Sequence, residues 1–254
     1  MSGPSIWKEE FRIKSYEVDM KGKATLTALC NYFQDAAGNH ADALEGGMSF
    51  LLERNQIWVL SRMLVRMEIL PRWNEKILVE TWSKGADGLF ALRDFLVLDA
   101  KGKTLGKATT GWLIIDLNTR RPQRLDTFIK QWPFTKEREG LDEKLERLAL
   151  CKPEKESLPF RVRVSDLDIN NHVNNVKYAE WIMDDFGMEM RTKYDIASFE
   201  INYQAEAFYN DEVFIRSERI PEEQPVFLNA VIRKSDNKEI CRVRTGWKSR
   251  GDGA

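Results

Sequence analysis

Three polar side chains alternate in the segment SDLDINNHVNN, residues 165–175: Asp168, Asn170 and His172. A carboxylate, an amide and an imidazole at this spacing offer an acid–base group, a hydrogen-bond donor and a proton carrier. The alternative is a helix-capping turn, because Asp and Asn side chains accept hydrogen bonds from the first N–H groups of a helix. A cap needs only one such residue, so the alternation, followed by Asn174 and Asn175, indicates a candidate catalytic motif.

A second candidate carboxylate is Glu206, at the end of SFEINYQAE, residues 198–206. Strand alternation places Phe199 and Ile201 on one face and Glu206 on the other. From spacing alone, an exposed strand carboxylate is the simpler interpretation of Glu206. The other histidine, His40, continues an apolar helical stripe, so we expect it to be structural or to line a pocket.

The composition describes a globular protein without a global charge. Of 254 residues, 43% are hydrophobic, and 39 Lys and Arg balance 40 Asp and Glu, which argues against general nucleic-acid or membrane binding. Cys30, Cys151 and Cys241 have neither disulfide-framework nor metal-ligand spacing, so we expect no metal and no cofactor. No apolar run is long enough for a signal peptide or a membrane span, which indicates a cytoplasmic protein.

The chain contains two diverged copies of one unit. Thr110-Gly111-Trp112 recurs as Thr245-Gly246-Trp247, and Asn74-Glu75-Lys76 recurs as Asn210-Asp211-Glu212, at offsets of 135 and 136 residues. Tyr32 and Tyr178, 146 residues apart, lie in the two predicted helices. Three anchors in the same order favour a duplication.

Each copy is predicted to contain an initial strand, one amphipathic helix and four successive strands. The helices are expected over residues 24–44 and 173–187. Strands are expected near 56–69, 76–84, 89–100 and 104–116, and near 197–207, 212–220, 225–235 and 239–248. Strands without intervening helices favour antiparallel sheets, so the predicted fold class is α+β with two tandem hotdog units, each a long helix wrapped by a sheet. The expected domains are 1–126, a charged linker with one short helix at 127–157, and 158–254.

The duplication allows an internal comparison of the candidate site. The helix anchor aligns Asp168, Asn170 and His172 with Gly22, Ala24 and Leu26, and the strand anchor aligns Glu206 with Leu70. On this alignment no acid–base group of the second copy has a counterpart in the first, which predicts one site per chain.

The sequence resembles the acyl-acyl carrier protein (acyl-ACP) thioesterases of plants and bacteria. RVRVSDLDINNHVNNVKYAEWIMD and SFEINYQAE are similar to the family signature D-x-N-x-H-V-N-N-V-K-Y, with a glutamate 34 residues beyond the histidine. The resemblance implies catalytic roles for Asp168, Asn170, His172 and Glu206, and an acyl pocket in residues 1–126. Plant members often have cysteine where this chain has Ala207, and they carry a targeting extension that this chain lacks, so a bacterial, cytoplasmic member is implied.

The resemblance also implies a substrate and a partner. The expected reaction is hydrolysis of the thioester of fatty acyl-ACP, which releases free fatty acid and ends chain elongation. Acyl-CoA hydrolysis on the same fold and non-catalytic acyl binding are the alternatives. Basic side chains are expected to meet the acidic ACP, and the candidates are Arg120, Arg121, Arg124, Arg161, Arg163 and Lys177. Three further points are left open: acyl chain length, the carboxylate that activates water or attacks, and whether exposed sheet edges form a homodimer.

Overall fold

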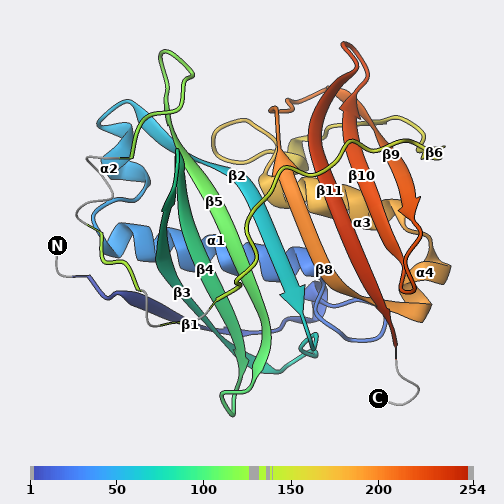
Figure 1. Ribbon diagram of the computed structural model, residues 1–254, viewed down its shortest axis with the longest axis horizontal. Coiled ribbons are helices and arrows are strands. Elements are labelled where there is room, and N and C mark those ends of the chain that lie inside the picture. Colours follow the sequence, from blue (N-terminus) through green and yellow to red (C-terminus); the bar gives the residue numbers. More distant parts are fainter. Residues whose placement is uncertain (1–2, 126–131, 136–137, 139, 251–254) are drawn as a thin grey trace. The chain divides into compact units, whose positions relative to one another are not determined.

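A computed structural model describes residues 3–125, 132–135, 138 and 140–250. The chain divides into two compact units, Met1–Leu145 and Glu146–Ala254. Each unit combines an antiparallel sheet with a long helix, α1 in the first unit and α3 in the second (Figure 1). The predicted α+β hotdog fold is therefore confirmed.

The first unit orders its strands β1-β3-β4-β5-β2. Its elements are β1 Ile6–Arg12, α1 Leu26–Ala43, α2 Met48–Leu52, β2 Gln56–Met67, β3 Lys76–Asp87, β4 Phe90–Asp99 and β5 Thr104–Asp116, with a 3-10 turn at Ser15–Glu17. Helix α1 begins at Leu26 because the Thr25 side chain caps it by accepting from the N–H of Ala28. Its buried face includes Leu29 and Phe33, as the helical periodicity predicts.

The second unit orders its principal strands β8-β11-β10-β9, and two short strands, β6 and β7, both pair with β9. Its elements are β6 Lys155–Glu156, β7 Phe160–Arg161, a 3-10 turn Val164–Asp166, α3 Asn175–Asp185, α4 Met188–Lys193, β8 Tyr194–Tyr203, β9 Glu212–Ile220, β10 Val226–Arg233 and β11 Lys238–Ser249. The predicted strand 197–207 is wrong at both ends, since β8 ends at Tyr203 and Glu206 lies in the following loop.

The two units repeat the same local hydrogen bonds and turn conformations, which confirms the duplication. In each Thr-Gly-Trp triplet the indole N–H bonds to the threonine hydroxyl two residues earlier, at 2.8 Å for Trp112 and 3.1 Å for Trp247. Asn74 and Asn210 both adopt positive φ, 68° and 69°, in the turn that precedes β3 or β9. Asparagine tolerates this left-handed conformation better than other side chains with a Cβ.

The charged segment between the copies was expected to contain a short helix. Its described residues from 140 to 154 contain no helix, while residues 127–131, 136, 137 and 139 lie outside the described part. Residues 140–154 form an irregular segment without helix, and sheet side chains bind its backbone carbonyls. Arg62 donates to Leu145 O at 2.6 Å in the first unit, and Arg242 donates to Leu148 O at 2.6 Å in the second. These bonds replace the intrahelical bonds that a helix would have provided.

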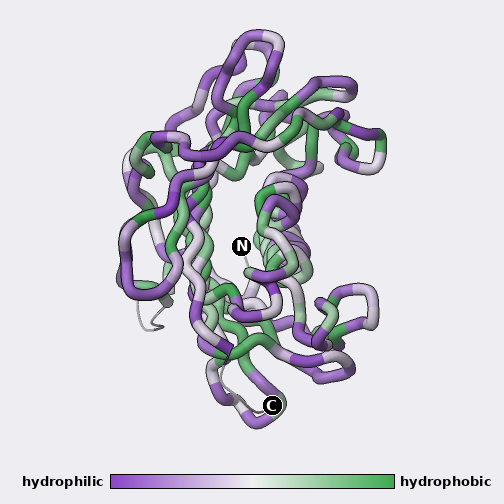
Figure 2. The backbone as a smooth tube through the Cα atoms, turned by 90° about the vertical axis from the view of Figure 1, so that its right-hand side faces the viewer, coloured by the Kyte–Doolittle hydropathy of each residue, from purple (hydrophilic) through white to green (hydrophobic). Residues whose placement is uncertain are grey.

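Hydrophobic residues concentrate along the strands and helices, and the hairpin ends are mostly hydrophilic (Figure 2). Among the described residues, no helix is long and apolar enough to cross a membrane.

Candidate active site

The motif that contains Asp168, Asn170 and His172 folds into a tight turn just before α3. The Asp168 N–H donates to His172 O at 2.8 Å, and one oxygen of the Asp168 side chain accepts from the N–H groups of Asn170, at 2.8 Å, and His172, at 3.3 Å. Asn171, at the tip, has φ 61°. The carboxylate of Asp168 therefore stabilises the turn that presents the other two side chains.

The first unit forms the same turn. There Asp19 donates its N–H to Lys23 O at 2.7 Å, and its carboxylate accepts from the N–H groups of Lys21, at 2.8 Å, and Lys23, at 3.1 Å. The helix caps that follow, Thr25 and Asn174, are also 149 residues apart. Asp168 thus corresponds to Asp19.

The predicted alignment of Asp168, Asn170 and His172 with Gly22, Ala24 and Leu26 is therefore wrong by three residues. The hydrogen-bond pattern that the two turns share pairs these residues with Asp19, Lys21 and Lys23. The error arose because Tyr32 and Tyr178, used as an anchor, occupy different positions in their helices. At the corrected offset of 149, Tyr178 corresponds to Leu29.

His172 and Glu206 come together in the second unit. The N–H of Val173 donates to Ala207 O at 3.0 Å, which places the two loops side by side, and His172 Nδ1 lies 3.5 Å from Glu206 Oε1. Both side chains are partly exposed, at 28% and 36%. The Phe208 ring packs edge-on against the imidazole, with centroids 5.2 Å apart. A carboxylate at Nδ1 orients the ring and leaves Nε2 for proton transfer.

The equivalent positions of the first unit hold no such pair. Its matching bond runs from Ala24 N–H to Pro71 O at 2.8 Å, so Pro71 corresponds to Ala207 and Leu70 to Glu206, as predicted. With Lys23 in place of His172, the first unit has the turn without a His–carboxylate pair.

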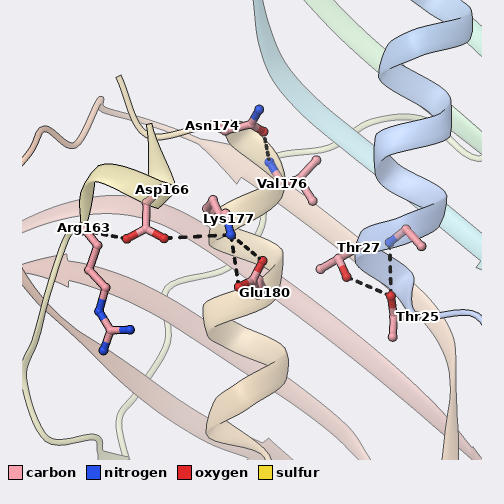
Figure 3. A network of polar contacts seen from close by, with 9 residues as sticks. Thr25, Thr27, Arg163, Asp166, Asn174, Val176, Lys177 and Glu180 are labelled. Carbon is pink, nitrogen blue, oxygen red and sulfur yellow. Dashed lines mark hydrogen bonds and ion pairs between the residues drawn. The ribbon is translucent and has the colours of Figure 1, made fainter. Parts of the chain in front are cut away.

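The N-terminus of α3 is already capped. The side chain of Asn174 accepts from Val176 N–H at 2.9 Å (Figure 3). The backbone carbonyl of Asn174 accepts from Lys177 N–H at 2.9 Å. Lys177 forms an ion pair with Glu180 at 2.9 Å and lies 4.0 Å from Asp166. The first N–H groups of this helix are therefore less accessible to a developing oxyanion than those of an uncapped helix would be.

His40 is buried in the first unit, in agreement with a structural role. Its Nε2 lies 2.8 Å from Pro4 O and its Nδ1 lies 2.8 Å from the Arg93 guanidinium, so Nδ1 accepts and Nε2 donates. Burial, followed by the charge of Arg93, lowers the pKa of His40 to about 4. A neutral imidazole is the form that satisfies both contacts.

In the first unit, where the resemblance implies an acyl pocket, apolar side chains are buried. Met63 and Met67 are buried core residues, and the Trp58 indole donates to Gly46 O at 2.9 Å. Arg120, Arg121, Arg124, Arg161 and Arg163 are exposed. Within the described part of the chain, no three His, Cys, Asp or Glu side chains form a potential metal site.

Comparisons with known proteins agree with this architecture. Models of the acyl-ACP thioesterase N-terminal and C-terminal domains match residues 4–131 and 151–249. The chain is 28% identical to oleoyl-acyl carrier protein thioesterase 2 of Arabidopsis thaliana, over 96% of this chain and 77% of that protein. A crystal structure of an acyl-ACP thioesterase from Bacteroides thetaiotaomicron has a TM-score of 0.89 at 31% identity, covering 96% of this chain and 98% of that one.

A solved 12:0-ACP thioesterase from Umbellularia californica has a TM-score of 0.85 at 25% identity, and 97% of this chain and 98% of that one are covered. Two tandem units, each a long helix with an antiparallel sheet, together with these similarities define the class of protein as thioester hydrolases of the hotdog fold. Within that class the chain belongs to the acyl-ACP thioesterase family.

Proposed function

We propose that this protein hydrolyses the thioester of fatty acyl-ACP and releases free fatty acid, with Glu206 and His172 as its central catalytic pair. The observation that carries the proposal is the 3.5 Å approach of His172 Nδ1 to Glu206 Oε1. This distance suits an apo site, because catalytic contacts often shorten only when substrate is bound. Family membership supports the same reaction.

The pair can serve both halves of the reaction. Glu206 either takes a proton from a water that attacks the thioester carbonyl, or attacks the carbonyl itself to form an anhydride that water then cleaves. In either route the C–S bond breaks, and His172, protonated at Nε2 for this step, donates that proton to the departing thiolate. The proton released by the attacking water, directly or by way of Glu206, then returns to His172. The Asn170 amide is proposed to donate a hydrogen bond to the carbonyl oxygen.

Asp168 has a different role in this proposal. Its carboxylate makes the same two backbone contacts as Asp19 does in the first unit. We therefore assign Asp168 to the turn and Glu206 to the chemistry.

Replacement of Glu206 tests the site. We expect Glu206→Ala to lower kcat on acyl-ACP by about 10² to 10⁴, the usual size of an acid–base contribution. Glu200→Ala, on strand β8 of the same unit, is the matched control and should keep near-normal turnover. Wild-type turnover in Glu206→Ala would exclude the proposed site.

Isotope labelling separates the two routes. In a single turnover in ¹⁸O water, label in the Glu206 carboxylate shows direct attack, because water enters that group when it cleaves the anhydride at the Glu206 carbonyl carbon. General-base action places the label in the fatty acid alone.

We also propose that the first unit holds the acyl chain, that residues 127–157 link the two domains, and that the protein is cytoplasmic. The support is the difference between the units: the first has buried Met63 and Met67, and its turn carries Lys23 instead of a histidine.

Arg161 and Arg163 are our preferred contacts for ACP. They alternate around buried Val162, so both are exposed on one side of an extended segment. Val162 bonds through its backbone to Asn210 and Asp211, in the loop after the exposed Phe208. Two arginines and an apolar ring beside His172 suit an acidic carrier protein that delivers an acyl group.

Charge reversal tests this contact. The double variant Arg161→Glu/Arg163→Glu should raise KM for acyl-ACP about tenfold, leave KM for the same acyl group on CoA nearly unchanged, and reduce the salt dependence of KM. Arg120→Glu/Arg121→Glu is the control from the first unit. Equal effects of both double variants would contradict a specific docking site, and faster turnover of acyl-CoA by the wild type would favour the alternative carrier.

A further inference from the structure

One peptide group of the Glu206 loop is held at both ends by side chains. Arg233 Nη1 donates to Glu206 O at 3.2 Å, and the Ala207 N–H donates to the hydroxyl of Tyr178 at 3.1 Å. Ala207 is fully buried, and only 3% of Tyr178 is exposed. Because β8 ends at Tyr203, these bonds replace sheet pairing where Glu206 leaves the strand.

Arg233 is itself fixed in place at the end of β10. Its Nε and Nη2 donate to the two carboxylate oxygens of Asp236 at 3.0 and 2.8 Å, and Nη1 lies 3.5 Å from Asp211. Asp211 in turn accepts from the Phe208 N–H at 3.0 Å. A bidentate guanidinium has little freedom to move, so Arg233 connects a rigid strand end to the Glu206 loop.

The first unit lacks both holding groups. Ile77 and Val213 are 136 residues apart, which is the offset of the strand anchor, so they correspond. Asp99, the last residue of β4, pairs with Ile77, and Arg233 pairs with Val213, so Asp99 corresponds to Arg233. The Asp99 carboxylate accepts hydrogen bonds within its own hairpin. Leu29 stands in place of Tyr178.

The residue that corresponds to Ala207 is Pro71, which has no N–H that needs a partner. A contact required by the fold itself would appear in both units. Among the described residues, these contacts occur only in the unit that carries Glu206.

We propose that Arg233 and Tyr178 are positioning residues that hold the Glu206 carboxylate against His172 by clamping the peptide group between Glu206 and Ala207. The inference rests on the proposed role of Glu206. Misplacement of a catalytic group by about 1 Å can reduce the rate about 10²-fold, so loss of the clamp acts on turnover more than on substrate binding.

Arg233→Met removes the donors and keeps most of the apolar stem. We expect kcat to fall about 10- to 100-fold with KM changed less than about threefold, and Arg233→Lys to recover part of the loss. Arg242→Met is the matched control, because Arg242 also binds a backbone carbonyl, that of Leu148, and a carboxylate, that of Glu239. It should lower the urea midpoint and leave kcat nearly unchanged. A parallel loss of kcat in the Met variants of Arg233 and Arg242 contradicts positioning.

A double-variant comparison shows whether Arg233 acts through Glu206. In a Glu206→Ala background, Arg233→Met and Tyr178→Phe should cause no further loss of kcat, because the group they position is absent. An undiminished effect in that background overturns the inference. Tyr178→Phe, which removes one oxygen, provides the same test if Arg233→Met does not fold.

The two proposals fail differently. Normal turnover by Glu206→Ala removes the proposed active site. A large loss in Glu206→Ala with normal turnover in Arg233→Met and Tyr178→Phe removes only the positioning role.

Discussion

Buried His40 should make the stability of this protein depend on pH. The imidazole accepts from Arg93 and donates to Pro4 O, and its folded pKa is lowered from 6.5 to about 4, first by burial and then by the arginine charge. Between these two pH values the unfolded chain binds a proton that the folded chain does not. The free energy of unfolding therefore falls as pH decreases through this range and is regained as pH rises.

The size of the effect follows from the same values. A pKa difference between 6.5 and about 4 corresponds to about 3 kcal/mol over the whole range, of which about 2 kcal/mol is lost by pH 5. Burial also raises the pKa of Asp94, which acts in the opposite direction. The contribution of His40 must therefore be measured as a difference between two proteins.

His40→Gln provides that difference, because its amide can accept from Arg93 and donate to Pro4 O without titrating. We expect urea unfolding of the wild type to lose about 2 kcal/mol more than this variant between pH 7.5 and pH 5. Parallel curves for the two proteins would refute the assignment of a buried, neutral imidazole.

Two further predictions concern backbone strain and thiol reactivity. Asn210 has φ 69°, so Asn210→Ala should reduce the free energy of unfolding by about 1 kcal/mol while Asn210→Gly costs less, as measured by urea unfolding. Cys30 and Cys241 are buried with raised pKa values, about 12 for Cys30, so a thiol reagent at pH 8 should label them only after unfolding. Rapid labelling of both in the native protein would contradict their burial.

The periodicity of the sequence predicted most of the fold. Helix α1 and strands β2 to β5 lie within a few residues of the predicted ranges, because long amphipathic segments and β-branched runs with clear turns leave few alternatives. The short helices α2 and α4 were missed, since five or six residues carry too little periodicity. The expected linker helix is absent from residues 140–154, where side chains from the sheets, such as Arg62 and Arg242, bind the backbone, and part of the rest of its predicted range lies outside the described residues.

The sequence predicted the residue types of the candidate site, but it aligned the motif with the wrong residues of the first unit. An aromatic anchor within a helix is a weak guide, because a helix can place tyrosines at different turns in the two copies. The turn around Asp19 and Asp168 identifies the register through backbone bonds, which the sequence does not display. The clamp by Tyr178 and Arg233 was missed for the same reason, since it is visible only once Leu29 and Asp99 are recognised as their counterparts.

The corrected alignment of the two units assigns different roles to Asp168 and Glu206, which the sequence motif alone does not distinguish. If Asp168 only stabilises the turn, Asp168→Asn should keep turnover within about tenfold of wild type, because an amide oxygen can accept the same bonds from the N–H groups of Asn170 and His172. Asp19→Asn is the control, with a similarly small effect on stability and normal activity. A loss of 10³ or more in kcat for Asp168→Asn alone would show that its negative charge takes part in the reaction. Glu206 would then share the acid–base work with a carboxylate whose backbone contacts are the same in both units.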